Sequence, residues 1–502
     1  MCAIVATHVA PLAFAEESAS SGPYKHPPLD PIEANGKIFV DWPKPDVALL
    51  FTGERDGFLE PCGCAGLENQ KGGLKRLHTL VKQLSAQGWP LVALDLGGQT
   101  KRFGMQAEMK FSYAIKAFDQ IGYRAVGLGS NDLRLDVLSL VINIDEADNP
   151  FVSANVGIAG FDSGFTKRYK TVEAGGVKIG VTAVLGQQHL ARLKNSDELT
   201  LLEPAEALKQ VLSELRAAAC DHLVLLSFAD PEESKVLARQ FPEFDLVVTA
   251  GGAEEPANAA QPIQGAESRL VEVGHKGMYV VVVGLYKNGE TEFRYQRVPL
   301  DARFQDAPDL QEIMVEYQRD LETIGLDGLG LKPSMHPSGW LFAGSEACAD
   351  CHTAATDVYL RTPHSHATET LVHLDPPRHF DPECLSCHAT GWEPQKYYPF
   401  TSGFLGLKAT PVMVGNGCEN CHGPAADHVA AENGEIDATD EELEAFRAAL
   451  RLKIVENEGN KEGQEFAKGK VVQMCIQCHD VDNSPDFDFQ AYWPHVKHDG
   501  KD

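Results

Sequence analysis

The chain has 502 residues, with 44 Lys and Arg against 72 Asp and Glu, which gives a formal net charge of −28. This length exceeds what one hydrophobic core organises, so two or more domains are expected, and a hydrophobic fraction of 43% argues against a mostly disordered chain. The negative charge argues against nucleic acid as a partner, and no apolar run of 18 residues follows the first 15, so no membrane span is expected.

The first segment, residues 1–15, is apolar and ends in Ala13-Phe14-Ala15, which is typical of a secretory cleavage site. The positive residues that usually open such a signal are missing, so a short buried segment is the alternative. On the first interpretation the protein is periplasmic or extracellular, and Cys2 is removed with the segment. Residues 16–45 are rich in Pro, Ser and charge and are expected to form a lead-in linker.

Residues 46–305 alternate short buried runs with amphipathic stretches, which indicates an α/β domain with buried sheets. The predicted strands cover 47–51, 91–94, 125–128, 151–152, 178–184, 222–226 and 246–249. The predicted helices cover 74–87, 109–121 and 204–218. A late hairpin is predicted from 271–286 and 291–298, with Asn288-Gly289 at its turn.

Several stretches of this region resemble, in order, the metallophosphoesterase domain of periplasmic 5′-nucleotidases and UDP-sugar hydrolases. They include Leu59-Glu-Pro-Cys-Gly-Cys64, Lys71-Gly-Gly-Leu74, Leu94-Asp-Leu-Gly97 and Phe151-Val-Ser-Ala-Asn155. The resemblance implies a layered α/β sandwich whose members hold two metals with Asp, His and Asn at strand ends.

The metal ligands of that family are altered here. The expected D-x-H reads Glu54-Arg55-Asp56, and the expected G-D reads Gly97-Gly98. The expected G-N-H-E reads Gly129-Ser130-Asn131-Asp132, and the expected S-H reads Ser227-Phe228. Residues 249–253, where the family has its final histidines, contain no His. Glu54, Asp56, Asn131 and Asp132 are at most the ligands of one weakly bound ion. We therefore expect a degenerate phosphoesterase-like domain, with an active nucleotidase as the alternative.

Two cysteines of this region stand out. Cys62 and Cys64, at C-x-C spacing in a Gly-rich turn, are a possible redox pair, as a strained disulfide or as metal ligands. A structural disulfide or buried thiols are the alternative. Cys220 precedes an apolar run and is expected to be an inert core residue.

Residues 306–340 are expected to link the domains. Apolar residues recur at helical spacing over 309–323, and a bridge containing Gly and Pro follows over 325–339.

Residues 341–502 hold four cysteine pairs of identical spacing, each followed by a histidine. The pairs are Cys348 and Cys351, Cys384 and Cys387, Cys418 and Cys421, and Cys475 and Cys478; the histidines are His352, His388, His422 and His479. At C-x-x-C-H spacing, two thiols bind the vinyl groups of a haem and the imidazole lies under the iron. Zinc sites or disulfides would not explain a histidine after every pair. The sequence therefore predicts four covalently bound haem c groups with these histidines as proximal ligands, which supports export.

Eight further histidines after residue 330 exceed the four distal positions, so every iron can take a second imidazole. The region resembles the multihaem cytochrome family that includes the tetrahaem electron acceptor of hydroxylamine oxidation. The stretches that match are the C-x-x-C-H motifs, Arg361-Thr-Pro-His364-Ser-His366-Ala367, Gly417-Cys-Glu-Asn-Cys-His-Gly-Pro424 with His428, and the segment from Trp493 to His498.

The resemblance implies distal ligands at His364 or His366, at His428 and at His498. The fourth distal ligand is the second of the His364/His366 pair, or His373. A mostly α-helical and irregular domain over 341–502 is expected, because the macrocycles form much of its core.

These features predict an exported tetrahaem cytochrome that transfers electrons, with the α/β domain as a docking or assembly module rather than an enzyme. One alternative is a multihaem oxidoreductase that acts on a small nitrogen or sulfur compound at a five-coordinate haem. Another is a subunit of an extracellular cytochrome filament. The expected partner is a basic redox protein, with self-assembly as a further possibility.

Overall fold

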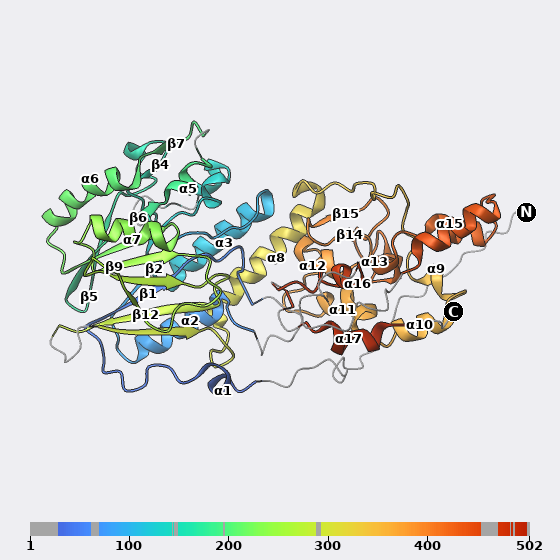
Figure 1. The fold of residues 1–502 in the computed structure, drawn as a ribbon, viewed down its shortest axis with the longest axis horizontal. Coiled ribbons are helices and arrows are strands. Elements are labelled where there is room, and N and C mark those ends of the chain that lie inside the picture. Colours follow the sequence, from blue (N-terminus) through green and yellow to red (C-terminus); the bar gives the residue numbers. More distant parts are fainter. Residues whose placement is uncertain are drawn as a thin grey trace, which may run out of the picture.

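The computed structural model describes residues 29–61, 70–142, 144, 149–193, 196–287, 293–452, 470–481, 483–484 and 487–498. Figure 1 shows an α/β region and a mostly helical region, with helix α8 (Pro308–Gly328) running from the first toward the second. The predicted signal segment and the pair Cys62 and Cys64 lie outside the described residues, so both remain predictions. No helix within these ranges is long and apolar enough to cross a membrane.

The first sheet of the α/β region has five strands in the order β13-β12-β1-β2-β3. Their bounds are β1 Val47–Thr52, β2 Leu91–Asp95, β3 Tyr123–Val126, β12 Tyr279–Leu285 and β13 Phe293–Pro299. Strands β1, β2 and β3 are parallel, whereas β12 runs antiparallel to both β1 and β13. The carboxyl ends of β1, β2 and β3 therefore meet at one edge, where the candidate metal-ligand positions lie.

The second sheet has six strands in the order β10-β11-β9-β8-β6-β5. Their bounds are β5 Lys170–Ala174, β6 Val177–Leu185, β8 His222–Phe228, β9 Leu246–Ala250, β10 Gln261–Pro262 and β11 Arg269–Val273. A separate two-stranded sheet pairs β4 (Val156–Ile158) with β7 (Leu199–Leu201).

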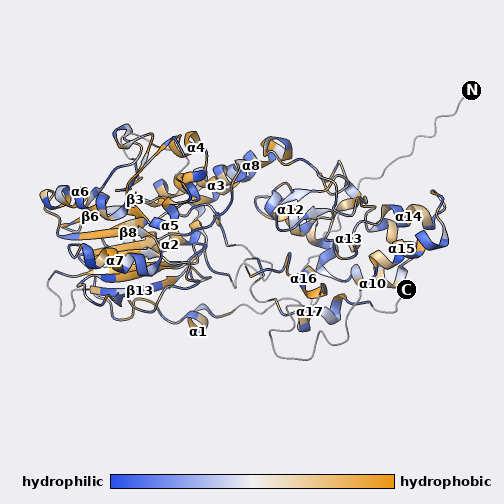
Figure 2. Cartoon of the chain, turned by 45° about the horizontal axis from the view of Figure 1, so that its top comes forward, coloured by the Kyte–Doolittle hydropathy of each residue, from blue (hydrophilic) through white to orange (hydrophobic). Residues whose placement is uncertain are grey.

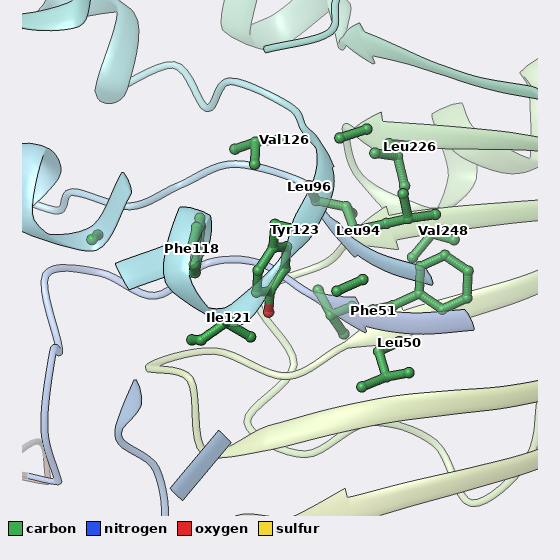
Figure 3. Close-up of a cluster of buried hydrophobic side chains, with 14 of the residues drawn as sticks. Leu50, Phe51, Leu94, Leu96, Phe118, Ile121, Tyr123, Val126, Leu226 and Val248 are labelled. Carbon is green, nitrogen blue, oxygen red and sulfur yellow. The ribbon is translucent and has the colours of Figure 1, made fainter. Parts of the chain in front are cut away.

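Helices cover the outer faces of both sheets. One core cluster joins both sheets with side chains of α2 (Leu74–Ala86), α3 (Met105–Ile121) and α8. A second cluster packs α6 (Pro204–Ala217) and α7 (Pro231–Gln240) against the six-stranded sheet. Figure 3 shows Phe118 and Tyr123 on the helix side of the first sheet and Val248 of the second sheet on the other side. Figure 2 shows that the central strands are hydrophobic along their length, as expected for strands buried on both faces.

This arrangement confirms the predicted layered α/β sandwich, but one predicted element was wrong. Residues 271–286 do not form one strand, because β11 ends at Val273 in the second sheet and β12 begins at Tyr279 in the first. Between them, Lys276 and Gly277 adopt φ values of 56° and 63°, which turns the chain from one sheet to the other. The hairpin of β12 and β13 is confirmed; its predicted turn, Asn288-Gly289, lies outside the described residues.

The remaining α/β helices are short. They are α1 (Pro31–Asn35), α4 (Val137–Val141) and α5 (Gln187–Leu190).

The C-terminal region consists of short helices and irregular chain, as predicted. Its elements are α9 Glu346–Ala349, α10 Thr353–Tyr359, α11 Ala367–Val372, α12 Pro382–His388, β14 Trp392–Glu393, β15 Tyr398–Pro399, α13 Cys418–His422, α14 Ala426–Glu432, α15 Asp440–Leu450, α16 Lys470–Cys475 and α17 Phe489–Val496. A small apolar cluster that includes Phe342, Leu385, Trp392 and Phe404 forms its protein core.

Candidate haem centre

Each of the four C-x-x-C-H motifs lies on a single helical turn. The motifs begin in α9, α12, α13 and at the end of α16, and residues three apart on a helical turn face the same side. None of these eight cysteines forms a disulfide. The local fold therefore presents two thiols and one imidazole together four times.

Three of the four proximal histidines have their Nδ1 atom occupied by a partner. Nδ1 of His388 lies 2.8 Å from the carbonyl oxygen of Ala367, and Nδ1 of His422 lies 2.7 Å from that of Leu450. Nδ1 of His479 lies 3.2 Å from Oγ of Ser484. A carbonyl oxygen only accepts, so Nδ1 of His388 and of His422 carries the proton and Nε2 is the nitrogen available to iron.

Burial keeps these imidazoles neutral, which is the form that ligates a metal. Desolvation lowers the pKa of His364, His388 and His422 below the usual value. For His479, burial and the neighbouring histidines lower the pKa to about 4.

Two histidines from elsewhere in the region stand opposite proximal ones. The ring centroids of His364 and His479 are 6.0 Å apart, and those of His422 and His498 are 5.7 Å apart. Metal–imidazole bonds are about 2.0–2.1 Å long, so each pair is spaced to hold one metal atom between two nitrogens. His364 and His498 thus occupy the positions expected of distal ligands.

The other predicted distal ligands differ in placement. His428, on α14, has a buried Nδ1 without a hydrogen-bond partner, and the proximity of His352 contributes to the lowering of its pKa, after burial. The side chain of His366 is 62% exposed and its Nδ1 lies 3.0 Å from Glu369. His373 is 64% exposed beside the same carboxylate. The structure thus brings His428 towards His352 and leaves His366 and His373 at the surface.

Cysteines of different motifs contact one another. The sulfur atoms of Cys348 and Cys418 lie close together, and so do those of Cys387 and Cys478. These contacts place the first motif beside the third and the second beside the fourth. Cys421 and Cys475 also interact electrostatically, which links the third motif to the fourth.

The residues present therefore fit covalently bound haem c. Free thiol pairs, imidazoles with Nε2 available and opposed histidine rings are what such a group requires. The described residues contain no group of three or more His, Cys, Asp or Glu arranged to hold a metal ion by themselves.

Glu419, which the sequence analysis did not single out, holds the third motif in place. Its side chain is 2% exposed and its carboxylate accepts hydrogen bonds from the backbone N–H groups of Ala343, Gly344 and Ala425 at 2.7–2.9 Å. The only feature of the sequence that could have indicated this role is the position of Glu419 between the two cysteines of the motif. Residues at that position are not regularly buried, so the role could not be predicted.

At the phosphoesterase-like edge, an aromatic ring fills the space beside the altered ligand positions. A Cβ atom added to Gly98 would lie 2.9 Å from the ring of Phe228, and one added to Gly129 would lie 3.0 Å from it. His189 packs edge-on against this ring, with Nδ1 3.1 Å from Oγ of Ser130.

The acidic residues of this edge are not gathered around a common point. Asp132 is fully buried and accepts hydrogen bonds from Gly98, Gly129 and Thr100. Glu54 accepts one from the N–H of Gly252, and burial raises its pKa. The weak ion site considered for Glu54, Asp56, Asn131 and Asp132 is not formed by this arrangement.

Comparison with known proteins matches both regions. Residues 347–423 match the family described as Cytochrome c554 and c-prime. Cytochrome c-554 of Nitrosomonas europaea is 28% identical over 155 residues, which cover 28% of this chain and 57% of that protein. A snake venom 5′-nucleotidase of Gloydius brevicauda is 24% identical over 190 residues, which cover 37% of this chain and 32% of that protein. A solved structure of a 5′-nucleotidase precursor from Thermus thermophilus has a TM-score of 0.47 and 19% identity, and the match covers 55% of this chain and 59% of that one.

The chain thus carries a cytochrome c554-type region and a 5′-nucleotidase-like region, as the sequence predicted. The cytochrome match implies covalently bound haem c. The matched residues contain the first three motifs, and the fourth, which ends at His479, lies beyond them. The chain spans about half of the cytochrome and a third of the nucleotidase that it resembles.

Proposed function

We propose that this protein is an exported tetrahaem c-type cytochrome that transfers electrons, with the α/β region as a docking or assembly module. The observation that carries the proposal is the opposition of His364 to His479 and of His498 to His422. An iron with two imidazoles has no open position, so it exchanges electrons rather than binding a substrate.

The chain itself contributes position and environment. Backbone carbonyls fix the Nδ1 protons of His388 and His422 and so orient both rings. The contacts between cysteines of different motifs order the attachment sites as first, third, fourth and second. Haem c bound at these sites would supply one-electron exchange, and the chain would hold neighbouring attachment sites next to one another.

A docking role for the α/β region is supported by the loss of the phosphoesterase site. Phe228 fills the space that a ligand side chain at position 98 would need, so hydrolysis is not the function we assign. Export is supported by the chemistry of thioether attachment and by the apolar segment 1–15. The net charge of −28 favours a basic redox partner.

The test is to count the haem groups and assign their ligands. The full chain, produced in a host that attaches haem c, is expected to carry four haem groups by intact mass and to show low-spin irons by electron paramagnetic resonance. His364→Ala and His498→Ala are each expected to convert one iron to high spin, because each removes one imidazole. His222→Ala, a control on β8 of the α/β region, is expected to leave the spectrum unchanged. Fewer than four haem groups, or unchanged spectra for both variants, would contradict the proposal.

A second candidate, small-ligand chemistry at one iron, is favoured by the surroundings of His388. Nδ1 of His388 donates to Ala367, and the nearby His364 and His479 face each other. An iron held by His388 alone would keep one position open. A high-spin signal in the unmodified protein that changes on addition of nitric oxide is the result expected for this candidate, and four low-spin irons would exclude it.

A further inference from the structure

The helix that carries the second attachment motif is held at its start by the α/β region. Asp381 caps α12, since its Oδ1 atom accepts the backbone N–H of Glu383 at 3.0 Å. The same carboxylate accepts Nε2 of Gln106, from α3, at 2.8 Å and Nε2 of Gln318, from α8, at 3.1 Å. Asp381 is 5% exposed and Gln318 is 4% exposed, so this contact is buried between the regions.

Glu383, directly before Cys384, faces two cations from the α/β region. Lys110 of α3 forms an ion pair and hydrogen bond with Oε2, and Nη1 of Arg102 lies 3.3 Å from Oε1. The guanidinium of Arg102 also lies 3.4 Å above the ring centroid of Tyr397 and donates to its hydroxyl. Two positive side chains of one region therefore converge on a single acid of the other.

The ion pair between Lys110 and Glu383 is less screened by water than the ion pair that Lys116, on the same helix, forms with Glu316. The side chain of Lys110 is 13% exposed, whereas that of Lys116, which pairs with Glu316 of α8, is 51% exposed. A pair removed from water acts more strongly on its surroundings than one at the surface. Lys110 and Lys116 thus offer a matched comparison on one helix.

We propose that Lys110 and Arg102 are positioning residues of the second haem site, which fix α12 through Glu383 and set the reduction potential of the haem attached at Cys384 and Cys387. The inference rests on the proposed haem function and adds that the α/β region is part of one haem site rather than a detachable attachment. Charges and hydrogen bonds around a haem tune its potential, because ferric iron carries one more positive charge than ferrous iron.

The charge balance gives opposite signs for the two partners. Lys110→Gln leaves Glu383 less compensated, which stabilises ferric iron and lowers the potential. Glu383→Gln leaves both cations without their acid, which stabilises ferrous iron and raises the potential. A unit charge roughly 12 Å from a redox centre, at an effective dielectric constant near 20, changes the ratio of the two states on the order of tenfold.

The experiment is a spectroelectrochemical titration of the full haem-loaded chain. For one of the haem groups, Lys110→Gln is expected to lower the ratio of reduced to oxidised iron about tenfold at a fixed applied potential, and Glu383→Gln to raise it by a similar factor; tenfold corresponds to 59 mV for a one-electron couple. The double variant is expected to return towards the unmodified value. Lys116→Gln is expected to leave all potentials unchanged.

Shifts of the same sign in both single variants, or no shift in either, would overturn the inference and leave a purely structural contact. If Lys110→Gln does not fold, Glu383→Gln and the double variant carry the same test, because the first is expected to raise the potential and the second to bring it back towards the unmodified value. Haem content is measured on every sample: a chain without haem refutes the proposed function, whereas a fully loaded chain with unmoved potentials refutes only this inference.

Discussion

Asp132 shows how the chain holds a buried carboxylate at the edge of the first sheet. Its Oδ2 atom accepts the backbone N–H groups of Gly98 and Gly129, and its Oδ1 atom accepts the N–H and hydroxyl of Thr100. All four acceptor directions are thus used by the chain. Burial nevertheless raises its pKa to about 6, because desolvation of the charge outweighs the hydrogen bonds.

A pH-dependent loss of stability is expected from this residue. A folded pKa of about 6 against 3.8 means that the folded state binds the proton more tightly. The contribution of Asp132 to the free energy of unfolding is therefore largest below pH 3.8 and falls by up to about 3 kcal/mol as the pH rises through 6. Asp132→Asn removes this slope, so the difference in stability between the two proteins is expected to shrink with rising pH.

Urea unfolding of both proteins, followed by circular dichroism between pH 4 and 8, measures that difference. Asp136→Asn is the control, because Asp136 is an exposed helix cap and asparagine caps a helix equally well. A difference that stays constant with pH would show that Asp132 does not titrate in this range.

Sequence reasoning could name the proximal histidines because each directly follows its cysteines. It could not choose between His364 and His366, which are two residues apart. The choice depends on the 3₁₀ turn Pro363–His366, which leaves His366 beside Glu369 at the surface and turns His364 towards His479. The hydrogen-bond partners of Nδ1 in His388 and His422 could not be predicted either, because they are backbone carbonyls, which every residue carries.

At the scale of elements, Glu419 ties α13 to the chain on both sides of it. Its carboxylate accepts the N–H groups of Ala343 and Gly344, which precede α9, and that of Ala425, which precedes α14. The first and third motifs are thereby held side by side, in agreement with the contact between Cys348 and Cys418.

Glu419→Gln is expected to destabilise the C-terminal region by roughly 2–4 kcal/mol, because an amide has one acceptor oxygen and sets its own N–H₂ against backbone donors. The thermal midpoint of the haem-loaded chain, followed at the haem absorbance band, measures this loss. Glu346→Gln, at an exposed position of α9, is the matched control and is expected to change stability by less than about 0.5 kcal/mol. Equal thermal midpoints for Glu419→Gln and Glu346→Gln would show that the hydrogen bonds accepted by Glu419 do not stabilise the region.

Helices of the α/β region were predictable where one face is apolar, as in α2, α3 and α6. Strands were less so. β12 is buried along its whole length, whereas β11 has an exposed Arg269 and a half-buried Glu272, and neither pattern indicates which sheet the strand enters. Only the turn at Lys276 and Gly277 separates them.

At the scale of the whole molecule, the two regions meet through contacts that join distant parts of the sequence. Lys110 and Glu383 are 273 positions apart, and Glu60 and Arg378, which also form an ion pair, are 318 apart. Pairings at such separations leave no local pattern. The sequence therefore predicted both folds but not how one is joined to the other.

The net charge of −28 predicts electrostatic steering of a basic partner to the proposed cytochrome. The reduced protein is expected to transfer electrons to a basic cytochrome c faster than to a sample of that cytochrome c whose lysines have been succinylated and which is therefore acidic. The rate for the basic form is expected to fall several-fold as the ionic strength rises from about 0.02 to 0.2 M, since the Debye length shortens. Stopped-flow absorbance measures both rates; a rate independent of salt would exclude steering by charge.

The ring of Phe228 has a consequence for engineering this edge of the sheet. Placing an aspartate at position 98 alone puts its Cβ atom 2.9 Å from that ring, at a backbone φ of +80° that disfavours any side chain. Replacing Phe228 by histidine alone opens the space but offers a metal a single imidazole. Neither substitution therefore creates a metal site by itself, and a designed site at this edge requires both positions to change together.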